Sequence, residues 1–219
     1  MIKLVVFDWN GVLIADAQAV VDTDNWILKQ YNRRPLDMRR YRETFTMPVK
    51  DYFLALGFSE EEMQREGKKI QEMFHPYYEN RISNIRTRSG ARKLLEWLAS
   101  RQIECVILSN HTKEGLENQL TRLNIKRYFS RVITNDMHAT MQVKNKTQKM
   151  IDLVGKSQYK NDEILIIGDS PEEVEAGRAS RARTVSITGG YYSERRLREA
   201  KPDHLIHKLS DLIGIIEKV

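Results

Sequence analysis

Short runs of β-branched, aliphatic and aromatic residues alternate with helical patterns along most of the chain, and this alternation limits the choice of fold more than any other feature. Such runs predict strands at residues 3–7, 104–108, 131–134, 163–167, 183–187 and, more weakly, 204–207. Apolar residues at helical spacing predict helices at 90–100, 113–123, 146–154 and 172–180. Strands joined by helices of this length form βαβ units with a parallel sheet. The sequence therefore predicts an α/β fold with a doubly wound parallel sheet.

One long interval breaks this alternation. Residues 15–84 contain no convincing strand pattern, whereas apolar stripes predict helices at 16–31, 49–56 and 60–78. We expect residues 15–84 to form a helical cap of four helices, inserted into a core made of residues 1–14 and 85–219. The two connections between cap and core should then lie close together and serve as hinges.

The net charge is positive, but its distribution does not by itself identify a partner. The chain has 36 Lys and Arg against 30 Asp and Glu, which gives +6, and the surplus lies in residues 29–50 and 178–201. A solvated surface explains such segments. Attraction of an anionic substrate or of a nucleic acid is the alternative.

The sequence supports neither a membrane protein nor a protein with an internal disulfide. No apolar run approaches the ~20 residues of a transmembrane helix, and the apolar stretch before Asp8 is too short for a signal peptide. We therefore expect a cytoplasmic protein without membrane association. The single Cys105 lies within an apolar run, which predicts a packed strand residue and excludes an internal disulfide.

Polar side chains follow three of the predicted strands directly. Asp8 follows the first, Ser109 the second and Asp169 the fourth, while Lys144 and Lys146 precede the helix that leads into the fourth. Ligands of open parallel sheets bind at the carboxyl ends of the strands. Two carboxylates, a hydroxyl and an ammonium that meet there would bind a divalent cation and a phosphate. We expect the carboxylates of Asp8 and Asp169 to lie within about 8 Å, because one ion with ligand bonds of ~2 Å must reach both.

These motifs resemble those of the haloacid dehalogenase superfamily, and the resemblance spans nearly the whole chain. Residues 8–13 are similar to its first motif, 108–110 to its second and 166–173 to its fourth. Lys144 resembles the lysine of the third motif, with Lys146 as the alternative. The helical insertion stands where the phosphoglycolate phosphatase-like branch has its cap. The resemblance implies a Rossmann-like core with an inserted helical cap.

The resemblance also implies a Mg²⁺-dependent phosphatase that acts on a small phosphorylated metabolite. Asp8 would be the nucleophile and would form an aspartyl-phosphate that water hydrolyses. The other implied roles are Mg²⁺ binding by Asp8, Asp169 and the backbone carbonyl of Asn10, contacts to phosphate oxygens from Ser109, Asn110, Lys144 and the backbone around Trp9, and support of the lysine by Glu173, with Ser170 beside it. Arg42 and Lys50, which flank the loop between two predicted cap helices, are candidate contacts to the far end of the substrate.

Asn10 is the main departure from the superfamily pattern. Typical phosphatases of the superfamily have Asp at this position, where it is the general acid for the leaving oxygen and the general base for water. An amide can do neither, so we expect poor alkoxide leaving groups to react slowest. His111 follows the second motif and is an alternative proton donor, although a loop histidine that faces solvent is the more ordinary interpretation.

Three other functions remain open at this point. A dehalogenase would also lack the second acid, but dehalogenases of the superfamily use no metal, and Asp169 then has no purpose. A phosphonoacetaldehyde hydrolase would need a cap lysine, and Lys50 lies in the right interval without the matching surroundings. A catalytically weak or silent protein that binds phosphate or nucleic acid, or has a regulatory role, would account for Asn10 and the basic segments. We favour the phosphatase.

Overall fold

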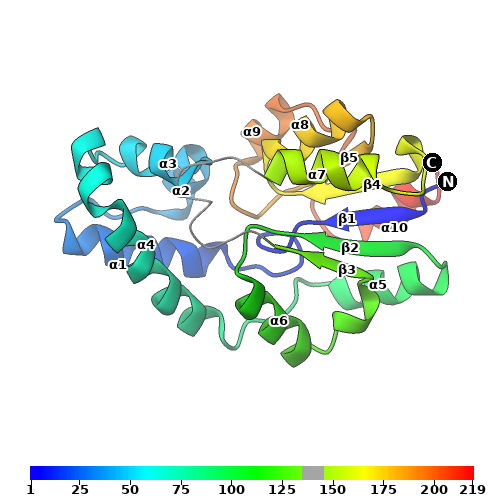
Figure 1. Cartoon of the computed structure of the whole chain (residues 1–219), viewed down its shortest axis with the longest axis horizontal. Coiled ribbons are helices and arrows are strands. Elements are labelled where there is room, and N and C mark those ends of the chain that lie inside the picture. The colour runs from blue at the N-terminus through cyan, green and yellow to red at the C-terminus, as the bar shows by residue number, and fades with distance from the viewer. Residues whose placement is uncertain (135–145) are drawn as a thin grey trace.

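The computed structural model describes residues 1–134 and 146–219, and its centre is one parallel sheet of six strands (Figure 1). The strands are β1 (Leu4–Phe7), β2 (Glu104–Leu108), β3 (Arg131–Ile133), β4 (Ile164–Gly168), β5 (Arg183–Ile187) and β6 (His204–Ile206). Their order is β3-β2-β1-β4-β5-β6, so the direction of winding reverses between β1 and β4. The predicted α/β fold with a doubly wound parallel sheet is confirmed. A reversal of this kind opens a crevice at the carboxyl ends of the two strands.

Helices cover both faces of the sheet. They are α5 (Ala91–Ser100), α6 (Lys113–Arg122), α7 (Lys146–Gly155), α8 (Pro171–Ser180), α9 (Glu194–Glu199) and α10 (Asp211–Ile216), with short 3₁₀ turns at Lys126–Tyr128 and Asn161–Glu163. Val5 and Phe7 of β1 pack with α5, α6 and α10, whereas Leu4 and Val6 pack with α7 and α8. Successive side chains of a strand point to opposite faces, so a strand covered on both sides is apolar throughout. Cys105 is buried in β2, as predicted.

Four helices form a second apolar cluster beyond the carboxyl ends of the strands (Figure 1). They are α1 (Ala17–Gln30), α2 (Met38–Thr44), α3 (Val49–Ala55) and α4 (Glu60–Ile82). Ser59 and Glu62 form a capping box that begins α4. The helix continues past residue 78, where the sequence predicted its end, and buries both Tyr78 and Ile82. The inserted helical unit expected from the sequence is present.

The chain enters and leaves this helical unit through two adjacent segments. Ile14 and Thr87 form an isolated antiparallel bridge, and the Arg88 backbone N–H donates to the Leu13 carbonyl oxygen at 2.7 Å. We propose on this basis that residues 15–84 are a cap that can move about residues 14–15 and 84–87. Residues 1–14 and 85–219 would then form the core.

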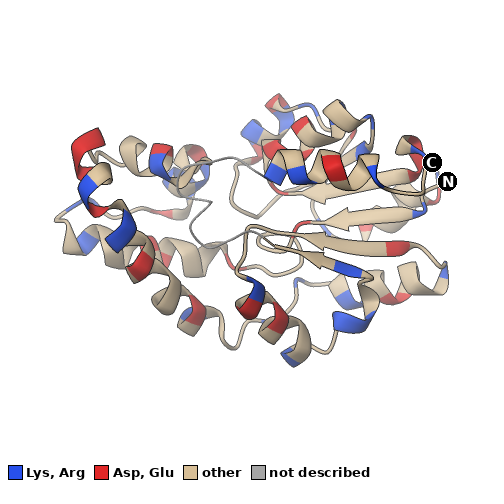
Figure 2. Cartoon of the chain, viewed as in Figure 1, with Lys and Arg blue, Asp and Glu red and all other residues tan. Residues whose placement is uncertain are grey.

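The two basic segments lie against each other and are interleaved with acidic residues. Arg195 pairs with Glu43 at 2.5 Å, and Arg196 donates to the carbonyl oxygens of Arg42 and Phe45 at 3.1 and 2.6 Å. Blue and red segments of the ribbon, which mark basic and acidic residues, alternate along the outer helices (Figure 2). Within the described residues, no helix is long and apolar enough to cross a membrane.

Candidate active site

Asp8 lies at the end of β1, where the sheet opens, and is buried. Its exposed fraction is 7%. Oδ1 accepts the backbone N–H of Trp9 at 2.7 Å, and Oδ2 lies 2.8 Å from Nζ of Lys146. Burial raises the pKa of Asp8 to about 7, although the Lys146 ammonium acts in the opposite direction. Asp8 is thus a desolvated carboxylate beside a fixed cation.

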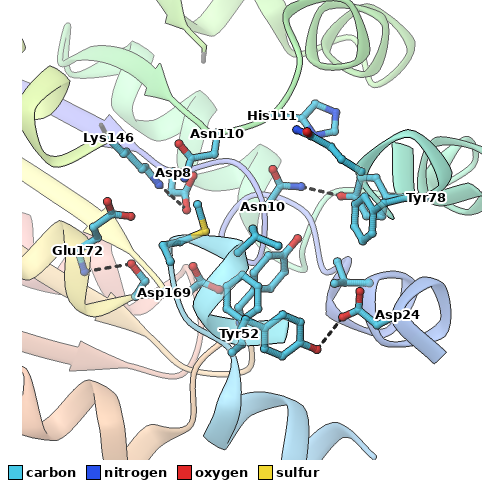
Figure 3. A pocket seen from close by; sticks show the side chains of 18 of the residues that line it. Asp8, Asn10, Asp24, Tyr52, Tyr78, Asn110, His111, Lys146, Asp169 and Glu172 are labelled. Atoms are coloured by element: carbon cyan, nitrogen blue, oxygen red, sulfur yellow. Dashed lines mark hydrogen bonds and ion pairs between the residues drawn. The ribbon is translucent and has the colours of Figure 1, made fainter. Parts of the chain in front are cut away.

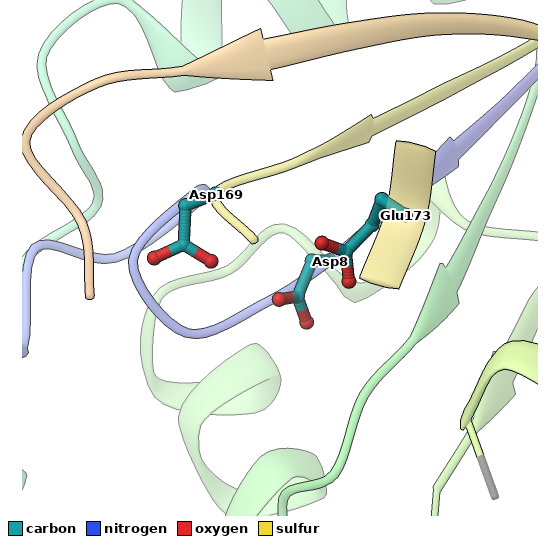
Figure 4. A group of neighbouring side chains, drawn as sticks. All are labelled: Asp8, Asp169 and Glu173. Atoms are coloured by element: carbon teal, nitrogen blue, oxygen red, sulfur yellow. The ribbon is translucent and has the colours of Figure 1, made fainter. Parts of the chain in front are cut away.

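Two further carboxylates surround Asp8 (Figure 4). Asp169 follows β4 and Glu173 lies in the first turn of α8, and one oxygen from each of the three side chains lies within 4.8 Å of the others. This separation is inside the limit of about 8 Å that one shared ion allows. Burial, and then the charges of Asp8 and Glu173, raise the pKa of Asp169 well above its usual range. A cluster of this kind matches the oxygen ligands that divalent cations prefer.

Among the described residues, Lys146, the first residue of α7, is the lysine that reaches the cluster. Its Nζ lies 2.8 Å from Asp8 Oδ2 and 2.6 Å from Glu173 Oε1. Burial disfavours its charge, but the carboxylates outweigh burial and raise its pKa. Lys144, the preferred candidate from the sequence, lies outside the described residues. Lys146 was the alternative.

Two loop glycines allow the backbone to approach Asp169 closely. A Cβ at Gly11 would stand 2.1 Å from Asp169 Oδ2, and one at Gly190 would stand 2.0 Å from the same atom. Gly11 also has a φ of +71°, in the left-handed region that favours glycine. The backbone N–H of Tyr191 donates to this oxygen at 2.6 Å. The loops after β1 and β5 therefore hold the Asp169 carboxylate in place.

Ser170 connects the start of α8 to the carboxylate cluster. Its Oγ accepts the backbone N–H of Glu172 at 3.1 Å and donates to Glu173 Oε2 at 2.6 Å. The backbone N–H of Ser170 donates to the same Glu173 oxygen at 3.1 Å. This capping box fixes the Glu173 side chain toward Lys146.

The Asn10 amide points toward the cap and away from Asp8. Its Nδ2 donates to Asp16 Oδ2 and to the Tyr78 hydroxyl, both at 2.7 Å. Asp16, which is buried, also accepts the Gly11 backbone N–H at 2.8 Å and the Tyr191 hydroxyl at 2.6 Å. Asp16 therefore joins the loop after β1, helix α4 and the loop after β5. The sequence analysis did not identify Asp16, because its partners lie up to 175 residues away.

His111 is buried, so the expectation of a loop histidine that faces solvent is wrong. Its exposed fraction is 7%, because the loop after β2 lies beneath α4 of the cap. Nε2 lies 3.2 Å from Glu79 Oε1 of α4 and 3.2 Å from Gln119 Nε2. Gln119 Oε1 in turn accepts the indole N–H of Trp9 at 2.8 Å. A chain of contacts thus joins the residue after Asp8 to His111.

The other residues singled out in the sequence divide into two groups. Ser109 is buried beside the site, where its Oγ accepts the His111 backbone N–H at 3.1 Å, and Asn110 lines the cavity. Arg42 and Lys50 do not line the cavity. Arg42 donates to the carbonyl oxygens of Gly189 and Gly190, each at 2.9 Å, and Lys50 pairs with Glu60 at the surface. The side chains of these two cations are therefore engaged elsewhere.

A cavity of about 170 Å³ extends from Asp8 into the helical unit (Figure 3). Asp8, Lys146 and Asp169 lie at one end of it, and side chains from α1, α3 and α4 form the other end. Asp24 and Tyr52 face each other there (Figure 3). The sequence analysis named none of these cap side chains as site residues.

Known proteins share both the sequence pattern and the fold. A family model described as haloacid dehalogenase-like hydrolase matches residues 5–187. A phosphoglycolate phosphatase from Synechococcus elongatus is 24% identical over 217 residues, which covers 99% of this chain and 98% of that protein. The pyrophosphatase PpaX from Bacillus mycoides is 20% identical over 223 residues and covers 100% and 98%. Among solved structures, a haloacid dehalogenase-like family hydrolase from Streptococcus pneumoniae has a TM-score of 0.81 at 18% identity, with 98% of each chain covered.

Proposed function

This chain belongs to the haloacid dehalogenase-like hydrolase family, and we propose that it is a Mg²⁺-dependent phosphatase that hydrolyses a small phosphate monoester through an aspartyl-phosphate intermediate. One observation carries this proposal. The buried carboxylate of Asp8 lies at the crevice of the sheet, between an ammonium at 2.8 Å and two further carboxylates. Relatives named phosphoglycolate phosphatase and pyrophosphatase support phosphoryl chemistry.

Asp8 would act as the nucleophile. One of its oxygens attacks the phosphorus, and the bond between phosphorus and the ester oxygen breaks as the new bond forms. Water then attacks the phosphorus of the aspartyl-phosphate, which releases inorganic phosphate and restores the carboxylate. Burial supports this role, because a carboxylate stripped of water is a stronger nucleophile.

Lys146 would bind an equatorial oxygen of the phosphoryl group. Its ammonium is already held next to Asp8 by Glu173, so little reorganisation is needed when substrate binds. Asn110 lines the same cavity, Ser109 lies beside it and the Trp9 N–H contacts Asp8, so these groups would donate to the remaining oxygens. Ser170 and Glu173 would keep the lysine in position.

Asp8 and Asp169 would hold Mg²⁺, together with the backbone carbonyl of Asn10. The donor set fits, because buried carboxylates within 4.8 Å of one another carry more negative charge than the single Lys146 ammonium balances. When bound, Mg²⁺ would neutralise charge on the phosphoryl group and so reduce its repulsion by Asp8. The glycines at positions 11 and 190 keep the backbone close enough for Asp169 to take part.

The leaving oxygen needs a proton that Asn10 cannot supply. His111 lines the same cavity and contacts the carboxylate of Glu79, an arrangement that allows a histidine to hold and deliver a proton. We therefore propose His111 as the donor for leaving groups that need one. Aryl phosphates, whose leaving groups are stable as anions, would depend on it least.

Asn10 also supports a second candidate function, a phosphate-binding protein with little or no turnover. Such a protein would bind phosphate with Mg²⁺ but release none from esters. A nucleic-acid ligand has weaker support, because Arg195, Arg196 and Arg198 of the second basic segment pair with acidic residues or a backbone carbonyl. A steep dependence of nucleic-acid affinity on salt would favour that ligand.

Phosphate release from phenyl phosphate tests the main proposal. We expect release that requires Mg²⁺ and stops with a chelator, and an Asp8→Asn variant that is slower by at least about 10³-fold, since its amide cannot form the intermediate. Asp22→Asn, which removes a partly exposed carboxylate from α1, is the control. Release by Asp8→Asn at the wild-type rate would contradict the nucleophile, and release without any divalent cation would contradict the metal.

A further inference from the structure

The far end of the cavity has a chemistry that narrows the substrate class, provided that the proposed phosphatase function holds. We propose that the site takes a phosphate monoester whose leaving group is a compact apolar body with a hydrogen-bond donor at its far end. Asp24 of α1 would accept that donor. An acidic substrate such as phosphoglycolate would then be a poor one, although a relative carries that name.

Apolar side chains make most of the wall that faces away from Asp8. They include Val20, Phe45, Phe53, Ile70 and Phe74. Aromatic and aliphatic walls favour ligands that remove apolar surface from water. A body that is polar all round would lose its hydration here without replacement.

The cavity is small, which limits the size of that body. Its volume is about 170 Å³, close to the ~150 Å³ of a protein cavity that accommodates benzene. The phosphoryl group would occupy the end beside Asp8 and Lys146. The remainder therefore accommodates a body no larger than about one aromatic ring.

Among the described residues, Asp24 is the carboxyl group at this end of the cavity, where Gln71 and His75 also line the wall. Asp24 is 2% exposed and lines the cavity. Oδ2 accepts the Tyr52 hydroxyl at 2.7 Å, and within residues 1–134 and 146–219 no hydrogen bond reaches Oδ1. Burial raises the pKa of this carboxyl to about 7, against the effect of the Tyr52 hydrogen bond. A hydrogen-bond donor on a ligand that fills the cavity would pair with this oxygen and so offset the cost of excluding water from it.

The two ends of the cavity differ in their charged groups: Lys146 and the carboxylates that would hold Mg²⁺ lie at one end, and the Asp24 carboxyl lies at the other. Of the described residues that line the cavity, Lys146 is the one lysine or arginine. A substrate with a second anion would place that anion beside Asp24, where repulsion in a desolvated site is strong. A hydroxyl or an ammonium in the same place would be attracted.

A matched set of aryl phosphates tests this inference. Phenyl phosphates with a 4-aminomethyl, 4-hydroxymethyl or 4-carboxymethyl group have similar leaving oxygens, since a methylene separates each substituent from the ring. We expect kcat/KM with Mg²⁺ to be at least about tenfold higher for the amine and the alcohol than for the acid. Phosphoglycolate should be worse than all three. A preference for the acid would overturn the inference.

The Asp24→Asn variant tests whether Asp24 is responsible for the preference for the amine over the acid. The amide keeps the size of the side chain and removes its charge, so the ratio between the amine and the acid should fall by at least about tenfold. Asp22→Asn is the matched control, because residue 22 is on the same helix, pairs with Arg81 at 3.1 Å and does not line the cavity. It should leave the wild-type ratio unchanged. An unaltered ratio in Asp24→Asn would overturn the role of Asp24.

Binding measurements separate this inference from the proposed function. The probes are the corresponding 4-substituted benzylphosphonates, which cannot be hydrolysed, and calorimetry with Mg²⁺ measures their dissociation constants. The same order of affinity without any phosphate release would support the ligand class and contradict the phosphatase. Phosphate release with equal affinity for all three probes would support the phosphatase and contradict the ligand class.

Discussion

Among single residues, Asn10 distinguishes this site most sharply from a phosphatase with two acidic residues in its first motif. Its amide donates to both Asp16 and Tyr78, so it has a structural task that a carboxylate could not perform unchanged. Under the proposed function, the site therefore combines a nucleophile and metal ligands with a proton donor that must come from elsewhere. The dependence of the hydrolysis rate on the leaving group should reveal this combination.

Asn10→Asp should widen the range of leaving groups. The new carboxyl would lie beside Asp16 in place of an amide donor at 2.7 Å, and the two carboxyls would share a proton at neutral pH. We expect wild-type protein to prefer phenyl phosphate to glycerol phosphate, and Asn10→Asp to raise the relative rate on glycerol phosphate by about tenfold or more. Asn118→Asp, at an exposed position of α6, is the control. An unchanged ratio would show that another group, with His111 the first to test, supplies the proton.

Asp24 should make stability depend on pH. Its pKa is about 7 in the folded chain, against about 4 in an unfolded one, so between these values the folded state holds a proton that the unfolded state has released. The contribution of Asp24 to the free energy of unfolding is therefore most favourable below about pH 4, where both states hold the proton, and it becomes less favourable as pH rises to about 7. Asp24→Asn should therefore become more stable than wild type across this range, by about 2–4 kcal/mol at pH 8. Denaturant unfolding at pH 5 and pH 8 measures the difference, and an equal difference at both pH values would contradict the shift.

Among the elements, the strands were predictable and some helices were not. Strands covered on both faces are apolar throughout, so β1, β2 and β4 were found within a residue or so of their ends. Four cap helices were expected but only three were located; the position of α2 was not predicted, because Tyr41 is its single buried residue and one apolar position gives no helical periodicity. Helix α9 was missed for the same reason, with Leu197 alone buried.

The part of the site that strand ends supply was predictable for a related reason. Asp8, Ser109 and Asp169 each follow a strand, and parallel strands bring their carboxyl ends to one edge. Asp24 and Glu79 were not found, because their place beside the cavity depends on how cap helices pack across it. No local pattern encodes a contact of that kind.

The first turn of helix α8 should affect both the stability of the protein and its Mg²⁺ requirement. Ser170→Ala removes the Oγ that caps the helix and holds Glu173, whereas Ser193→Ala removes the cap of α9 without touching the cluster. Each should lower the free energy of unfolding by about 1 kcal/mol. Ser170→Ala alone should raise the Mg²⁺ concentration needed for half-maximal phosphate release, by about threefold or more. Equal Mg²⁺ requirements in the two variants would contradict the proposed support of Lys146 by Glu173.

In the whole molecule, polar contacts across the cavity join the helical unit to the sheet. Tyr78 and Tyr191 both donate to Asp16, and Arg42 of α2 donates to the loop after β5. These contacts lie at the rim, whereas each side has an apolar cluster of its own. Hydrogen bonds of this kind can break and re-form without unfolding either side, which suits a cap that opens for substrate and closes for reaction.

The bridge between Ile14 and Thr87 has an evolutionary consequence. Because the chain departs from the sheet and returns to it at neighbouring points, an insertion of any size can be exchanged there without altering a single strand pairing. Selection can therefore reshape what the enzyme recognises while leaving its phosphoryl chemistry intact. A core that performs the reaction and an inserted unit of separate evolutionary origin that recognises the substrate can be combined in one polypeptide in this way.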